Sequence, residues 1–161
     1  MSQIRKRTLK ATWWIYTGFL IGAINVYLFT NLHWFSAAQY GLTTSLRELS
    51  MLVCGLSALG VTSFLYKFFP YYEDNLAPQK NDMLGLALKV ALFGFIAMSS
   101  ILYILKPLVI RKFSENSPLL VEYFYYIIPM GFCILLFQVL EAYSYSFGKG
   151  VLTSFLKETL V

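Results

Sequence analysis

The sequence predicts an all-α fold: a polytopic membrane helix bundle with four transmembrane helices. Its composition is the first reason, because 58% of the residues are hydrophobic and only 13% are charged, against about a quarter in an ordinary soluble domain. The second reason is a set of four apolar runs of helix length with short polar segments between them. The third is a cluster of four cations near the N-terminus, which we interpret as a topology signal and not as a nucleic-acid patch.

The four predicted spans cover residues 12–32, 43–68, 83–110 and 121–147. A helix of about 20 residues is roughly 30 Å long, which matches the hydrocarbon core of a bilayer. In the first span, Gly18, Gly22 and Asn25 share one face, so another helix should approach closely there. Asn25 would then either form a hydrogen bond between helices or line a cavity.

The second predicted span follows a polar turn over residues 36–44 and starts with an ionisable pair, Arg47 and Glu48. Such a pair is costly inside a bilayer, so it must lie at the membrane boundary, or face protein or a wet cavity. Small residues repeat every fourth position further along and predict a packed stripe, made of Ser50, Cys54, Ala58 and Thr62. The spacing predicts that Arg47 lies on this stripe and that Glu48 is rotated away by about 100°.

A polar loop is predicted over residues 67–82, before the third span. Within the third span, Lys89 should either extend to the nearby interface or line a pathway. Pro129 should kink the fourth span. Further along that span, Gln138 and Glu141 share a face, and Glu141 is either paired, interfacial or truly intramembrane.

The two cysteines, Cys54 and Cys133, are interpreted as small core residues of apolar runs. The last stretch, residues 148–161, is amphipathic and should run along the membrane face as a cytoplasmic connector.

The distribution of positive charge predicts that both termini are cytoplasmic. With four spans the termini share one side, and that side collects eight cations: Arg5, Lys6, Arg7, Lys10, Lys67, Lys80, Lys149 and Lys157. The opposite side collects three, Lys106, Arg111 and Lys112, or four if Arg47 is counted. Cytoplasmic loops carry the excess of Lys and Arg, which gives the orientation.

The sequence contains no catalytic or metal-binding pattern. His33 is its one histidine, and there is no glycine-rich phosphate loop, no Ser/His/Asp arrangement and no ligand spacing for a metal. We therefore predict no enzyme activity and no cofactor. Sparse polar groups on packed apolar helices are more typical of a transporter or a helix-bundle scaffold.

Several short motifs resemble the N-terminal part of bacterial polysaccharide-biosynthesis flippases, in the multidrug/oligosaccharidyl-lipid/polysaccharide exporter superfamily. They lie in order along the chain: Gly18, Gly22, Ile24 and Asn25; Tyr40, Gly41 and Leu42; Leu59 and Gly60; Phe68, Phe69, Pro70 and Tyr71; Glu141 to Tyr145; and Ser154 to Glu158. Family members carry two related bundles, whereas this chain holds four spans. The resemblance therefore implies a fragment: one partial transmembrane bundle over residues 1–161.

The resemblance implies that the transporter flips lipid-linked oligosaccharide by alternating access, for polysaccharide or lipopolysaccharide biosynthesis in the bacterial inner membrane. Its partners would be the bilayer, the lipid-linked oligosaccharide, and either the missing C-terminal helices or a second copy. From the helix faces, and not from a motif, we predict that Arg47 meets the substrate's diphosphate. Asn25, Gln138 and Glu141 would add polar lining.

The alternative is a self-contained four-span membrane protein, either a dimeric drug-type transporter or a non-transport scaffold subunit. A dimeric drug exporter usually needs a carboxylate deep in its first helix, and the first predicted span has none between Lys10 and His33.

Overall fold

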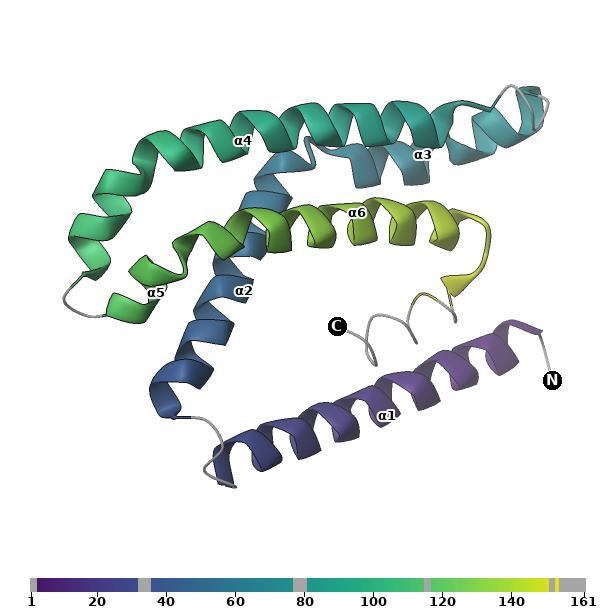
Figure 1. The fold of residues 1–161 in the computed structure, drawn as a ribbon. Coiled ribbons are helices and arrows are strands. Elements are labelled where there is room, and N and C mark those ends of the chain that lie inside the picture. The colour runs from purple at the N-terminus through teal and green to yellow at the C-terminus, as the bar shows by residue number, and fades with distance from the viewer. Residues whose placement is uncertain (1–2, 32–35, 77–80, 115–116, 151–152, 154–161) are drawn as a thin grey trace. The chain divides into compact units, whose positions relative to one another are not determined.

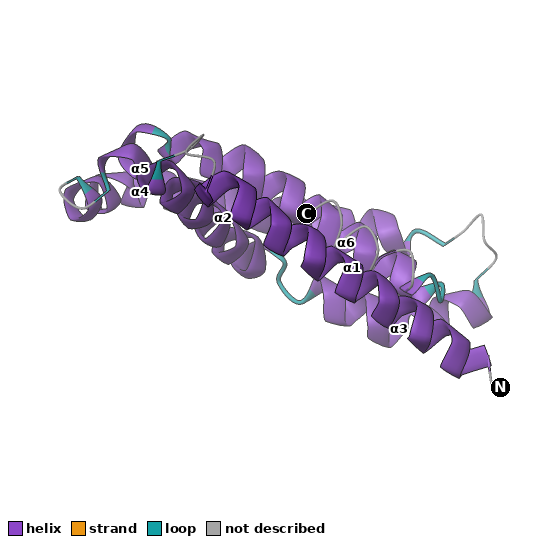
Figure 2. Cartoon of the chain, turned by 90° about the horizontal axis from the view of Figure 1, so that it is seen from below, coloured by secondary structure: helices purple, strands orange, loops and turns teal. Residues whose placement is uncertain are grey.

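The computed structural model describes residues 3–31, 36–76, 81–114, 117–150 and 153, and its regular elements there are all helices (Figures 1 and 2). The all-α prediction is therefore confirmed for the described part of the chain. The chain divides into two compact units, which we call the terminal unit (Met1–Ala37 with Ser144–Val161) and the central unit (Ala38–Tyr143).

Three helical segments of the described residues are long and apolar enough to cross a membrane: Thr8–Phe29, Met83–Phe113 and Phe124–Ser146. A fourth candidate is the bent pair formed by Ala37–Ser57 and Val61–Asn75, if it is counted as one span. The structure thus agrees with a polytopic helical protein of three to four candidate spans.

The terminal unit contains helix α1, Gln3–Asn31. The predicted start at residue 12 was wrong, because the basic residues before it are good helix formers and extend the helix. Large apolar side chains remain exposed along α1, including Trp13 at 71% and Phe19 at 77%, as on a helix that faces lipid. Of the predicted connector 148–161, most lies outside the described residues.

In the central unit, the second predicted span is two helices, α2 (Ala37–Ser57) and α3 (Val61–Asn75), which meet at 48°. The prediction of one continuous helix over residues 43–68 was therefore wrong. The interruption follows from the backbone: Leu59 has φ 46° and Gly60 has φ 76°, and such left-handed residues end helices. The left-handed conformation costs a residue other than glycine about 1–2 kcal/mol, so Leu59 is strained.

The boundaries of α2 and α3 correct two further predictions. The turn over 36–44 is absent because α2 already begins at Ala37, and the loop over 67–82 begins only after α3 ends at Asn75. Helix α3 continues through Pro70 because its buried stripe of Val61, Leu65 and Phe69 packs against the rest of the unit. This packing overrides the local turn signals.

Helix α4, Met83–Phe113, begins where the sequence predicts and ends three residues after the predicted Ile110. The predicted fourth span is interrupted near its start: a short helix α5 (Pro118–Glu122) and a 3-10 turn η2 (Phe124–Tyr126) precede α6 (Ile127–Ser146). Pro129 lies in the first turn of α6, where a proline removes no helical hydrogen bond. The backbone irregularity therefore precedes Pro129, and the kink predicted within the helix was misplaced.

Close backbone contacts define how the central unit packs. Figure 1 shows α3 running beside α4, and α2 crossing α6. A Cβ added to Gly94 on α4 would overlap the Ser57 carbonyl oxygen and lie 3.0 Å from Leu59 Cδ1. On α6, a Cβ at Gly131 would lie 3.4 Å from the Ser50 carbonyl oxygen. These two glycines let α4 and α6 approach α2.

The two cysteines have different environments. Cys54 is fully buried on α2, as predicted. Cys133 is exposed on α6, so its predicted core position was wrong. It lies two residues after the buried Gly131, and a helix turns by about 200° over two residues, to the opposite side.

We expect Gly94→Ala to destabilise the protein by roughly 1–3 kcal/mol, because its methyl group would push against the backbone of Ser57. Unfolding in mixed micelles under increasing SDS measures this loss. Gly55→Ala is the matched control, since its Cβ meets nothing within 4 Å. It should be neutral or slightly stabilising through helix propensity. Equal effects of the two substitutions would contradict the close contact.

Candidate functional site

A polar seam joins α2 to α6 in the interior of the central unit. It consists of Ser50, Cys54 and Gln138. The Ser50 hydroxyl donates a hydrogen bond to the Ile127 carbonyl oxygen at 3.2 Å, and the Cys54 thiol donates one to Gln138 Oε1 at 3.3 Å. Ser50 and Cys54 have no exposed surface, and Gln138 is half-buried.

The seam arises because α2 presents small side chains on its buried face. Its buried positions are Leu46, Ser50, Val53, Cys54 and Ser57, at helical spacing. Small side chains allow a close crossing, and hydroxyl or amide groups then hydrogen-bond across the interface. Ser50 bonds across to α6, whereas Ser57 bonds to the Val53 carbonyl oxygen of its own helix at 2.6 Å.

The predicted small-residue stripe is confirmed for Ser50, Cys54 and Ala58, all buried, whereas Thr62 is half-buried on α3. The prediction that Arg47 lies on the packed stripe was wrong, because Arg47 and Glu48 are both exposed. Leu46 occupies the buried position one turn before Ser50.

The four predicted lining residues lie in different places. Gln138 belongs to the seam, and the half-buried Glu141 lies one turn further along α6. Arg47 lies on the exposed face of α2, and Asn25 is exposed on α1 in the terminal unit. Of these four, Gln138 is the residue that forms the seam's hydrogen bond with Cys54.

The charged residues of α2 and α3 bound an apolar stretch of membrane thickness. Between Glu48 and Lys67 the chain has 18 residues without a charge, which would span about 27 Å as one straight helix and span somewhat less across the 48° bend. This length is close to the roughly 30 Å hydrocarbon core. Because α2 begins at Ala37, it extends about 15 Å beyond Arg47, so the Arg47–Glu48 pair lies at the boundary of the apolar stretch.

One contact that the sequence did not predict holds α4 against η2. Lys106 Nζ donates a hydrogen bond to the Tyr125 hydroxyl and lies 3.9 Å from the centroid of the Tyr125 ring. A lysine over an aromatic ring adds cation–π attraction. The sequence offers no signal for this pairing, because the two residues are 19 positions apart in different elements.

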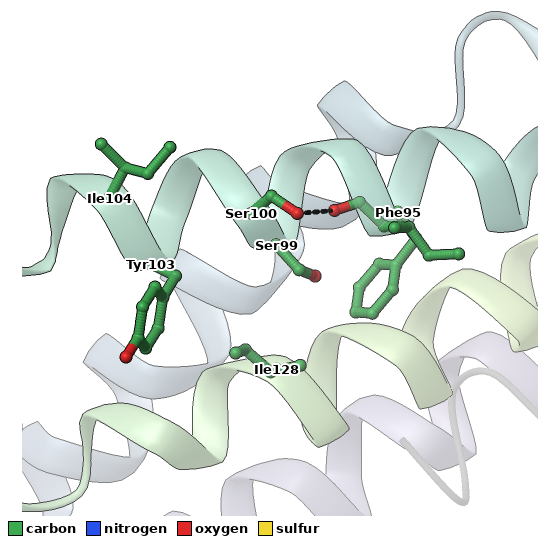
Figure 3. Close-up of a pocket in the computed structure, with 7 residues that line it drawn as sticks. Phe95, Ser99, Ser100, Tyr103, Ile104 and Ile128 are labelled. Carbon is green, nitrogen blue, oxygen red and sulfur yellow. Dashed lines mark hydrogen bonds between the residues drawn. The ribbon is translucent and has the colours of Figure 1, made fainter.

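A hollow of about 470 Å³ lies between α4 and α6 (Figure 3). Its walls are mostly apolar, with hydroxyl groups from Ser99, Ser100 and Tyr103. The Ser100 hydroxyl donates to the Ile96 carbonyl oxygen at 2.8 Å, while the buried Ser99 hydroxyl oxygen has no hydrogen-bond partner. None of the predicted site residues lines this hollow.

Among the described residues, no group of three His, Cys, Asp or Glu side chains is placed to hold a metal ion. In comparisons with known proteins, no family model, no curated protein and no solved structure matches this chain.

The seam bond between α2 and α6 should be measurable as an energetic coupling. We expect a double-mutant cycle of Cys54→Ala and Gln138→Leu to give a coupling of about 0.6 kcal/mol in unfolding free energy, typical of a hydrogen bond between membrane helices. Cys133→Ala with Gln138→Leu is the control cycle, since Cys133 is exposed. Equal coupling in the two cycles would argue against the thiol–amide bond.

Proposed function

We propose that this chain is part of a membrane transporter that flips lipid-linked oligosaccharide across the bacterial inner membrane for polysaccharide biosynthesis, by alternating access. The observation that carries the proposal is the broken candidate span of α2 and α3, bent by 48° beside a buried polar seam. The sequence motifs that resemble the flippases agree with it.

A broken span favours transport for a physical reason. An interruption frees backbone polar groups, and the bilayer core tolerates them only where protein covers them or where they line a cavity. Transporters use such discontinuous helices to build binding sites near the middle of the membrane. The interruption holds Leu59 in a strained left-handed conformation. A bundle that serves only as a scaffold has no need for such strain, which is typical of functional sites.

In this proposal Arg47 binds the diphosphate of the lipid-linked substrate at the boundary of the apolar stretch. Its side chain is exposed, so it is accessible to a ligand or to a further helix. A guanidinium forms bidentate hydrogen bonds with phosphate oxygens. Gln138, Glu141 and Asn25 would contribute polar lining, and further helices or a second copy would provide the opposite wall of the cavity.

We expect Arg47→Ala in the complete transporter to reduce polysaccharide export at least about tenfold, because loss of a bidentate phosphate contact costs on the order of 1.5–3 kcal/mol. Surface polysaccharide and the membrane level of the protein are measured together in a strain that lacks its own transporter. Arg47→Lys should restore only part of the export, because lysine binds phosphate as a point charge.

The matched control is Arg111→Ala, which removes another exposed arginine from a helix of the central unit. It should leave export unchanged. Normal export by Arg47→Ala at normal protein levels would contradict the role of Arg47. Export that persists when the whole coding region is deleted from an otherwise transporter-free strain would contradict the proposed function itself.

A further inference from the structure

We infer that residues 57–60 form a working hinge, about which α2 swings between the bent arrangement and a straight one that is collinear with α3. This deepens the proposed transport function, because it names the moving part.

The backbone change needed at the hinge is small in extent. Ser57 is helical. The Ala58 N–H donates a hydrogen bond to the Cys54 carbonyl oxygen, and the Ala58 carbonyl oxygen accepts one from the Val61 N–H, so Ala58 still makes the backbone bonds of a helical turn. Within residues 57–60, Leu59 and Gly60 are the two with left-handed backbones. Moving these two residues to right-handed helical angles would continue one helix from α2 into α3. Hinges in proteins commonly consist of a few such residues.

The strain at Leu59 brings the two arrangements closer in free energy. Leucine disfavours the left-handed region, so the bent form carries a cost that the straight form would not. The Leu59 side chain rests over Gly94 but remains 60% exposed, so little burial is lost when it leaves. Gly60 favours the bent form, because glycine adopts the left-handed region freely and is a poor helix former.

Helix α3 runs beside α4, so we take α3 and α4 as the base about which α2 moves. Val61, Leu65 and Phe69 are all at most 4% exposed, and the Phe69 ring meets the Tyr143 ring of α6 at 6.0 Å. Helix α2 crosses α6 through two hydrogen bonds of 3.2 and 3.3 Å, one of them from a thiol, which is a weak donor. Straightening α2 must break these two bonds and uncover the buried face of α2.

The direction of the swing follows from the packing of α3 on α4. A straightened α2 would continue along the axis of α3 and so lie beside the second half of α4. From the 1.5 Å rise per residue and the 48° bend, straightening would move Gly41, about 25 Å from the hinge, by roughly 20 Å, and so shorten its distance to Leu108 on α4. The same movement separates Cys54 from Gln138 and opens the seam.

Spin labels on the full chain in lipid nanodiscs test this inference by pulsed electron resonance. The reporting pair is Gly41→Cys and Leu108→Cys, and the control pair within the base is Tyr71→Cys and Phe93→Cys. All four positions are exposed. The native cysteines are replaced by serine, which keeps a donor at position 54. We expect a major long distance and a minor short one for the reporting pair, and one distance for the control pair.

Substitutions at the hinge should shift the two populations in opposite directions. Gly60→Ala should raise the ratio of short to long distances about fivefold or more, because alanine disfavours the left-handed region. Leu59→Gly should lower that ratio by a similar factor, since it removes the strain of the bent form. Gly55→Ala should change nothing, because Gly55 lies in regular helix with open space around its Cβ.

A single distance that is the same in the parent chain, Gly60→Ala and Leu59→Gly would overturn the hinge and make the bend a fixed structural feature. If Gly60→Ala does not fold, either of two other results overturns the hinge. One is a parent chain that shows a single distance. The other is a parent chain with two distances whose ratio does not change in Leu59→Gly. The readout does not depend on substrate. A failure of the hinge therefore leaves the proposed transport function standing, and a failure of transport leaves the distances unaffected.

Discussion

The backbone contact between Ser57 and Gly94 is the constraint on which the central unit depends. Any side chain at position 94 would occupy the space of the Ser57 carbonyl group, so the last turn of α2 could not reach α4. That approach places Leu59 and Gly60 beside α4 and starts α3 along it. Once α3 is there, its apolar stripe is buried and α2 is directed across α6 (Figure 1).

Two kinds of contact hold these helices together. In a bilayer, apolar association between helices gains little from the hydrophobic effect, so packing and hydrogen bonds must replace it. Large side chains such as Leu65 and Phe124 fill the spaces around α4 and α6, and they give close van der Waals contact. The α2 crossing relies instead on small residues and the polar seam. The helices along α4 are therefore held by large apolar side chains, and the α2 crossing by small residues and hydrogen bonds.

The sequence predicted the helical class and the apolar segments because both follow from composition and run length. It also predicted the small-residue face of α2, since a spacing of four residues is a local property. It failed at residues 58–60 because the left-handed backbone of Leu59 depends on the fit against Gly94, 35 positions away. The pairing of Cys54 with Gln138 is likewise set by tertiary packing, and no local pattern encodes it.

The contrast between the two cysteines gives the chain an internal chemical reporter. Cys54 has no exposed surface while α2 lies on α6, whereas Cys133 is exposed on an apolar helix. A thiol reagent that dissolves in the bilayer therefore reaches one sulfur in the packed protein and both sulfurs once α2 has left α6. The ratio of singly to doubly modified chains, read by mass, follows the integrity of the α2–α6 crossing without any introduced label.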